Sequence, residues 1–362
     1  MFEILIPSIV FSYSIFNIQL SNIIFYPYLI GRLYTFNGKL NIKKSEFVPV
    51  VLFILMSIIS TISYSMITND FNFRTIVQLI FTFQYLILCI NLKIDQCKLE
   101  KKLIFYSRLL SFFIIFIFIY KGVYLNLNTL FTSGRLYGQD IIPGWPNSTA
   151  LPLIFTTWII LKNGTKLSFD LILFSISSIL TTSRMSIAAI IILWIYFLII
   201  KPNKEILKGK INRGSIFKFA IVILILAFLG FILMKNESFI YRLGVTYDRD
   251  NIFVSTIEYI KKSPLIGYGG NTIAQLYGKI SNNVIMYNWQ HTHNAFLEIA
   301  LRYGLPALLF FIVILYKLFK EQRSFDSKIL FLILIMLATS QILIRNFTFL
   351  FFIFLLNVYN LE

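Results

Sequence analysis

Residues 47–68 read FVPVVLFILMSIISTISYSMIT, an apolar stretch without a charged side chain. A helix of about 20 such residues crosses the roughly 30 Å hydrocarbon core of a bilayer, so this stretch predicts a transmembrane helix. Similar apolar runs occur at 72–92, 103–121, 145–161, 167–182, 185–200, 216–234 and 305–319. Two longer stretches, 3–36 and 328–360, contain polar interruptions and each predict two short helices. We therefore expect an all-α polytopic membrane protein with about 12 transmembrane helices, in a range of about 10–12.

The overall composition agrees with this class of protein. Of the 362 residues, 57% are hydrophobic and 14% are charged, whereas a soluble domain carries about 25% charged residues. This excludes a soluble enzyme, a nucleic-acid-binding module and a disordered scaffold, and it predicts one membrane domain over residues 1–362. Two cysteines, Cys89 and Cys97, do not make a disulfide scaffold. The first apolar segment lacks a cleavage site of the A-x-A type, so we expect it to act as a signal-anchor.

The net charge of +17 has a positional pattern. Short cytoplasmic loops of membrane proteins collect Lys and Arg. If both termini are cytoplasmic, the inside loops are 37–46, 93–102, 162–166, 201–218 and 317–328, and each is rich in lysine. The short outside connections carry only one or two cations each, among them Arg135 and Arg184. This alternation of lysine-rich and cation-poor loops predicts that both termini are cytoplasmic and that the short connections carrying Arg135 and Arg184 lie outside.

The long segment 235–292 is placed outside by this topology, as one large extracytoplasmic loop. Within it, Phe253, Ile257 and Ile260 follow a helical spacing, and an opposite polar face carries Asn251, Ser255, Glu258 and Lys262. The pattern predicts an amphipathic helix that ends at Ser263-Pro264 and a turn-rich stretch, Gly267–Asn271. Such a helix could lie on the outer membrane surface or cap a cavity.

Polar residues at the outer ends of the spans are the candidates for function. Arg184 opens the span 185–200, and Arg135 and Asn147 flank the outer end of the span 145–161. Taken singly, an arginine at such a place is equally well explained by its position at the membrane interface. Gly and Pro residues beside Arg135 and Asn147 are typical of loops, so a structural role explains each of these two residues when it is taken singly.

The densest polar cluster is His291-Thr-His-Asn-Ala-Phe-Leu-Glu-Ile-Ala-Leu-Arg-Tyr-Gly304. On a helix, Asn294, Glu298 and Arg302 would form one polar stripe, with Glu298 placed to pair with Arg302. The two histidines of this cluster could ligate a metal, but a zinc site usually takes three or four ligands, so we expect neither a metal nor a cofactor. A polar cap at the helix entry explains Arg302 but not the combination of His293, Asn294 and Glu298.

The run His293-Asn-Ala-Phe-Leu-Glu298, followed by Gly304, resembles the His-Asn-x-x-Leu-Glu signature of the O-antigen polymerase/O-antigen ligase family. These proteins are bacterial inner-membrane glycosyltransferases that use sugars linked to undecaprenyl pyrophosphate. Thr182-Ser-Arg184 is similar to the family's Ser-Arg pair. Arg249, followed by Pro264-Leu-x-Gly-x-Gly269, is similar to a segment of its large periplasmic loop, although Phe253 stands where the family usually has Trp.

A weaker upstream pattern matches Arg135, Gly138 and Pro146-Asn147. The resemblance covers the back two-thirds of the chain, while residues 1–130 match only as generic membrane helices. It implies a GT-C-like fold and metal-independent, inverting transfer of a glycan to a hydroxyl group at the periplasmic face.

The resemblance also implies roles for single residues. Arg184 and Arg249, supported by Arg135, would stabilise the charge that grows on the departing pyrophosphate, because guanidinium pairs phosphate oxygens bidentately. His293 would be the base, since its ordinary pKa lies close to working pH. Glu298 would be a second candidate base or the group that holds Arg302. The residues expected to bind substrate are Arg135, Asn147, Arg242, Asn294 and Arg302.

Polymerases and ligases of this family share the donor and differ in the acceptor, which is another lipid-linked repeat unit or the lipid A core. The size and the Phe-, Ile-, Asn- and Lys-rich composition favour a polymerase. Expected partners are the undecaprenyl-pyrophosphate-linked oligosaccharide, a chain-length regulator protein and membrane lipid, but no nucleic acid. A glycolipid flippase is disfavoured because the charges gather at one face. A purely structural partner in an export complex would leave the outer Arg and His residues dispensable.

Overall fold

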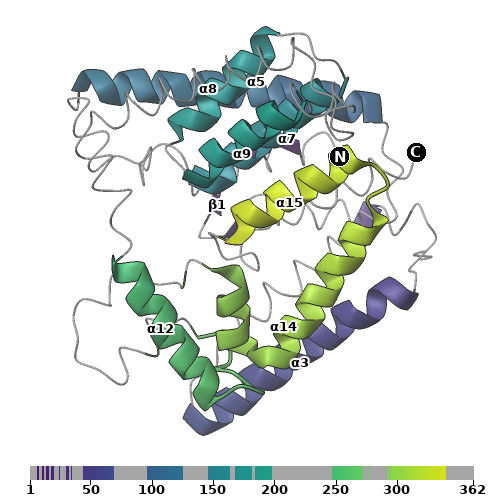
Figure 1. Cartoon of the computed structure of the whole chain (residues 1–362), viewed down its shortest axis with the longest axis vertical. Coiled ribbons are helices and arrows are strands. Elements are labelled where there is room, and N and C mark those ends of the chain that lie inside the picture. The colour runs from purple at the N-terminus through teal and green to yellow at the C-terminus, as the bar shows by residue number, and fades with distance from the viewer. Residues whose placement is uncertain are drawn as a thin grey trace, which may run out of the picture. The chain divides into compact units, whose positions relative to one another are not determined.

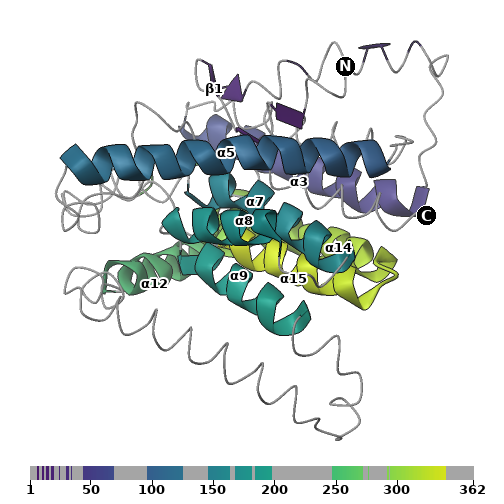
Figure 2. The same cartoon turned by 90° about the horizontal axis from the view of Figure 1, so that it is seen from above.

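The computed structural model describes residues 44–68, 96–124, 146–163, 168–181, 184–197, 247–271, Leu276, Thr292 and 294–339, together with scattered residues between 6 and 34. The chain divides into two compact units. The first comprises residues 1–21 and 95–245, and the second comprises residues 22–94 and 246–362. Figures 1 and 2 show the helices from two directions.

The described part of the first unit contains α5 (Gln96–Tyr124), α7 (Pro146–Asn163), α8 (Phe169–Leu180) and α9 (Arg184–Ile195). It also has a pair of two-residue antiparallel strands, β1 (Ser14–Ile15) and β2 (Ile18–Gln19). The described part of the second unit contains α3 (Lys44–Thr68), α12 (Tyr247–Lys262), α14 (Ala295–Glu321) and α15 (Phe325–Thr339).

The described residues confirm the helical, membrane-protein character that the sequence predicts. Three helices, α3, α5 and α14, are long and apolar enough to cross a membrane, and α8 and α9 are shorter apolar helices. Helices lie at the predicted spans 47–68, 103–121, 145–161, 167–182, 185–200 and 305–319. Helix α15 begins three residues before the stretch 328–360 and covers its first part. The predicted spans 72–92 and 216–234 fall outside the described residues, so the total of about 12 stays a prediction.

Two local expectations were wrong. We expected the stretch 3–36 to form two short helices, but Ser14–Ile15 and Ile18–Gln19 within it form the antiparallel β1–β2 pair, with Ser14 opposite Gln19. A short apolar run does not by itself distinguish a strand from a helix. In addition, α5 begins at Gln96, so Lys98, Lys101 and Lys102 lie in its first turns and not in a loop. Helices can continue beyond the apolar core of a bilayer, because their backbone hydrogen bonds are internal.

In the first unit α7 packs against α5, α8 and α9. Its aromatic side chains Phe155 and Trp158 are fully buried. Two polar contacts fix how the helices run: Asn163 at the end of α7 donates to Glu100 near the start of α5 (2.9 Å), and Arg108 of α5 pairs with Asp170 at the start of α8. Thus α7 ends beside the start of α5, and α8 starts further along α5, at Arg108.

In the second unit α3 packs along α14, and α12 and α15 also contact α14. The ring of Phe53 on α3 lies 5.7 Å from the ring of Phe311, while Ser60 lies opposite Arg302. The two helices are therefore antiparallel, and the end of α3 lies beside the start of α14.

The predicted amphipathic helix exists as α12, but the side that packs in the protein is not the predicted apolar face. The buried residues of α12 are Ile252, Ser255, Thr256, Tyr259 and Ile260. Ile257 is exposed, and Phe253 is only half-buried. The error arose because α12 carries apolar residues on more than one side, so spacing alone could not select the side that packs. The chosen side packs with Leu276, Ala300 and Leu301.

Candidate functional site

The N-terminal part of α14 is separated from the rest by a break at Gly304. This residue has φ 84° and ψ 171°, so Ala295–Tyr303 and Leu305–Glu321 are two helical pieces, and Figure 1 shows the change of direction between them. The left-handed φ favours glycine. Pro306 lacks the N–H group that would otherwise reach the carbonyl oxygen of Arg302 four residues earlier. The sequence Gly304-Leu-Pro306 therefore opens the helix and frees backbone groups.

The turn after α12, residues 263–271, fills this break. The backbone N–H of Tyr268 donates to the carbonyl oxygens of Leu301 and Arg302, each at 3.0 Å. In return, the N–H of Leu305 donates to the carbonyl oxygen of Pro264 at 2.7 Å. Buried backbone groups without hydrogen-bond partners destabilise a protein. These bonds supply partners to the groups that the break frees, and so they offset that cost.

The glycines of the turn are required by close approach. A Cβ atom on Gly267 (φ 71°) would lie 2.7 Å from the carbonyl oxygen of Arg302, and one on Gly304 would clash with the carbonyl of Leu265. A Cβ atom on Gly269 would lie 2.6 Å from the Cβ of Tyr64 on α3. The Pro264-Leu-x-Gly-x-Gly269 pattern is thus the sequence of a turn pressed between α3 and the break in α14.

Ser60 of α3 is a member of this site that the sequence analysis missed. Its hydroxyl donates to the carbonyl oxygen of Arg302 at 2.8 Å and accepts from the N–H of Gly269 at 3.2 Å. It therefore joins α3, the turn and α14 through one oxygen atom. The available signal was the spacing of Ser57, Ser60, Thr61 and Tyr64, which follows i, i+3, i+4, i+7 along an otherwise apolar helix.

Tyr268 anchors the turn from its other side. Its phenolic hydroxyl donates to the carbonyl oxygen of Tyr259 at 3.1 Å, and its ring lies against those of Tyr64 and Tyr259. Burial, and then the nearby Tyr64, raise the pKa of Tyr268 above its ordinary value. Its hydroxyl consequently stays protonated and able to donate through the physiological pH range.

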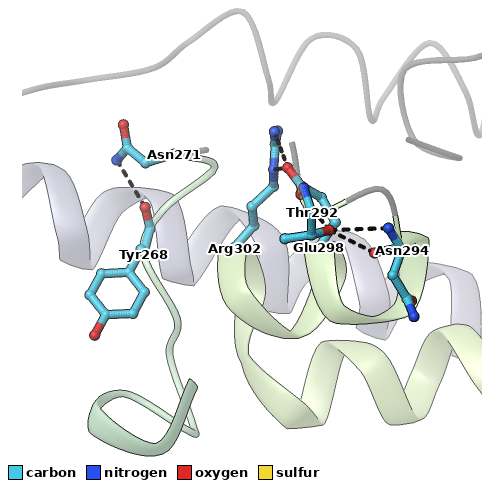
Figure 3. Close-up of polar contacts among 6 residues, drawn as sticks. All are labelled: Tyr268, Asn271, Thr292, Asn294, Glu298 and Arg302. Carbon is cyan, nitrogen blue, oxygen red and sulfur yellow. Dashed lines mark hydrogen bonds and ion pairs between the residues drawn. The ribbon is translucent and has the colours of Figure 1, made fainter. Parts of the chain in front are cut away.

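Glu298 and Arg302 form the charged centre of the site (Figure 3). Arg302 Nε donates to Glu298 Oε1 at 2.6 Å, and both side chains are about 1% exposed. This confirms the predicted pairing. Within the described residues, Arg302 Nη2 makes no hydrogen bond, although it lies 2.5 Å from the same carboxylate oxygen. A buried pair of this kind costs much free energy if one partner is removed.

The second oxygen of Glu298 holds the residue before the predicted base. Oε2 accepts from the backbone N–H of Thr292 at 3.1 Å, and the Thr292 hydroxyl lies 2.9 Å from it. That hydroxyl also lies 2.9 Å from the carbonyl oxygen of Asn294, and one proton can serve only one of these acceptors at a time. Both oxygens of Glu298 are therefore engaged. Of the two roles considered for it, holding Arg302 is the one that the geometry displays.

Asn294 precedes the helix, so the idea that it continues the polar stripe of Glu298 and Arg302 was wrong. Its Oδ1 accepts from the N–H groups of Phe296 and Leu297 at 3.0 and 3.2 Å, which makes it the N-cap of α14. Thr292 and Asn294, the two neighbours of His293 in the sequence, are thus both tied to the first turns of α14.

The remaining predicted residues are only partly described. Arg184 is the first residue of α9, Asn147 lies in the first turn of α7, and Arg249 lies in the first turn of α12. The side chains of these three, and the whole of His293, Arg135 and Arg242, lie outside the described residues. Among the described residues, no group of three or more His, Cys, Asp or Glu side chains could hold a metal ion.

Comparison with known proteins places this site in a family. No curated protein matches the chain significantly. A sequence model of the O-antigen ligase family, however, matches residues 170–312. The matched stretch includes nearly all of α8, all of α9 and α12, the turn 263–271 and the break in α14. Residues 170–312 are therefore a domain of the O-antigen ligase family, which confirms the resemblance to O-antigen polymerases and ligases.

Proposed function

We propose that this protein is a polymerase of O-antigen or capsular polysaccharide. It transfers a growing glycan from undecaprenyl pyrophosphate to a hydroxyl group of another lipid-linked repeat unit. The family match supports glycosyl transfer in general. The observation that carries the proposal further is the buried Glu298–Arg302 pair, which ties Thr292 to α14 directly before His293.

The reaction needs a base and a stabilised leaving group. The bond between the anomeric carbon and the phosphate oxygen breaks, the acceptor oxygen bonds to that carbon, and the hydroxyl proton passes to His293. Arg184 and Arg249, with Arg135, stabilise the charge that develops on the pyrophosphate. By analogy with oxyanion-hole donors, each well-placed donor contributes about 2.7–4 kcal/mol to transition-state stabilisation. We expect single displacement with inversion and no metal.

In this proposal Glu298 positions the neighbouring residues and does not accept the proton. Because Oε1 and Oε2 already accept from Arg302 and Thr292, a proton from the acceptor would have to displace one of these contacts. Holding Thr292, the residue before His293, lowers the conformational freedom of the base, which favours a reactive geometry. Asn147, Asn294, Arg242 and Arg302 are proposed to bind the donor and acceptor around it.

A ligase is the second candidate, and the description of the matching family favours it. The donor would be the same, and the acceptor would be a sugar of the lipid A core. In either case we place the protein in the bacterial inner membrane, with both termini in the cytoplasm and segment 235–292 in the periplasm.

The glycan profile of a deletion strain tests the proposal. If the protein is a polymerase, the strain carries surface glycan with a single repeat unit, because ligation continues without chain growth. Complete polymer that stays on the undecaprenyl carrier would establish the ligase instead. An unchanged surface and lipid-linked glycan would contradict both.

A further inference from the structure

Helix α12 and the turn after it have a side that no described part of the protein covers. We call it the interfacial side, and its exposed apolar members are Val254, Ile257, Leu265 and Ile266. Val254 is 58% exposed and Leu265 is 66% exposed, and the other two are also exposed. Exposed Glu258 and Lys261 lie on the same side, one helical turn after Val254 and Ile257. The opposite side of α12 is buried against α14. Exposed apolar side chains interleaved with a lysine suit a membrane interface, where the apolar atoms reach acyl chains and the ammonium group reaches lipid phosphates.

The interfacial side continues into the surface of the membrane-spanning part of α14. Leu305, which donates its N–H to Pro264, is itself exposed, and it is followed at helical spacing by exposed Leu309 and Ile312. In a spanning helix, such an exposed apolar strip faces lipid. The piece Leu305–Glu321 is about 26 Å long at 1.5 Å per residue, close to the thickness of the hydrocarbon core. The break at Gly304, and the turn seated in it, therefore belong near the edge of that core.

Charged and aromatic side chains around α12 fit the same level. Lys261 and Lys262 end the helix and are exposed, and Lys262 Nζ lies 5.4 Å from the centre of the Tyr259 ring. Tyr64, Tyr259 and Tyr268 gather on the packed side. Tyrosines are enriched at membrane interfaces, and lysines there reach out to lipid phosphates.

We propose that α12 and residues 263–266 rest in the interface of the outer leaflet. The interfacial side contacts phospholipid acyl chains, and Lys261 and Lys262 contact lipid phosphates. The occupant of this surface is the phospholipid bilayer and not a partner protein. The proposal deepens the proposed function in one respect, because Arg249 lies on the same helix. It would be held at the depth where the pyrophosphate of a lipid-linked donor lies.

Site-directed spin labelling tests this seating without reference to glycan synthesis. Cys89 and Cys97 are replaced by Ser in the full chain, and a single cysteine is introduced by Val254→Cys, Ile257→Cys or Leu265→Cys. Arg323→Cys, an exposed position between α14 and α15, is the water-facing control. The labelled protein is placed in nanodiscs, and collisions with oxygen and with a water-soluble nickel complex are measured.

We expect labels at 254, 257 and 265 to collide mainly with oxygen, which concentrates in the acyl region, and the label at 323 to collide mainly with the nickel complex. Nickel access at all four positions would overturn the proposal, and so would protection from both reagents at 254, 257 and 265. Labels at 257 should also lie deeper in discs of anionic lipid than in zwitterionic discs, and equal depth would remove the role of the two lysines. The collision measurements do not depend on glycosyl transfer. The proposed membrane contact of α12 and the proposed function can therefore be contradicted independently.

Discussion

Glu298 shows how one carboxylate can organise a site without taking part in proton transfer. Its two oxygens bind different segments: Oε1 holds Arg302 one turn further along α14, and Oε2 holds Thr292 before the helix begins. The sequence predicted the first contact, because the two residues are four apart on a helix. It could not predict the second, since Thr292 lies outside the helical repeat and is placed by the N-cap that Asn294 provides.

Removing only the charge of Glu298 should destabilise the protein more than replacing both Glu298 and Arg302 with apolar residues. Glu298→Gln leaves the guanidinium of Arg302 buried and unpaired, which costs about 3–5 kcal/mol by analogy with other buried pairs. The double variant Glu298→Met with Arg302→Met should recover most of this stability, because two apolar side chains of similar volume replace both charges. Thermal unfolding in detergent measures both effects.

Glycan chain length shows whether the Glu298–Arg302 pair only stabilises the fold or also positions the segment that carries His293. If it positions the His293 segment, the double variant should stay inactive although it is stable. A double variant that restores full chain growth would reduce the pair to a structural element.

Ser60 should matter more than its neighbour Ser57 on the same helix. Ser60→Ala leaves the carbonyl of Arg302 and the N–H of Gly269 with one partner fewer, at a cost of about 1–3 kcal/mol in unfolding free energy. Ser57 bonds only to the carbonyl of Phe53 in its own helix, so Ser57→Ala is the matched control and should cost less. Denaturant titration of both variants measures their unfolding free energies. Equal losses of unfolding free energy would argue against a linking role for Ser60.

At the scale of elements, the turn 263–271 and the break in α14 form one structure built from two distant segments. The signals for it were present in the sequence, as Gly304-Leu-Pro306 and as Pro264-Leu-x-Gly-x-Gly269. Their contact could not be predicted from spacing, because it depends on which carbonyls the break exposes and on Ser60 of α3. The packed face of α12 was missed for a related reason: Ile252, Phe253, Val254, Ile257 and Ile260 surround that helix, and only the partner selects among them.

Substitution at the break tests this structure. Gly304→Ala places a methyl group against the carbonyl of Leu265 and forces alanine into a positive-φ, extended conformation that is essentially restricted to glycine, which alone costs about 1–3 kcal/mol. We expect the turn to be displaced and glycan chain growth to be lost. Ile266→Ala, an exposed position of the same turn, is the control and should retain activity. Protease cleavage within 263–271 measures the displacement, and normal resistance in Gly304→Ala would contradict the tight fit.

At the scale of the whole molecule, the family domain accounts for helices in both compact units. Arg184 begins α9 in the first unit, while α12, the turn and the Glu298–Arg302 pair lie in the second. Hydropathy and loop charge predicted the helical membrane class, because burial in lipid requires long apolar helices. They predicted short spans at 167–182 and 185–200 but not the bounds of the described helices α8 and α9, because apolar length alone does not show where a helix begins or ends.

Reconstituted transfer is the most direct test of glycosyl transfer by this protein. Purified protein and undecaprenyl-pyrophosphate repeat units, without ATP and in the presence of EDTA, should give longer lipid-linked glycans. Arg184→Ala, Arg249→Ala and His293→Ala should each abolish them while the protein remains folded in the detergent. Products that appear only when lipid A core is added would identify a ligase. Chain growth that persists in all three variants, or that depends on a divalent metal, would contradict the proposed mechanism.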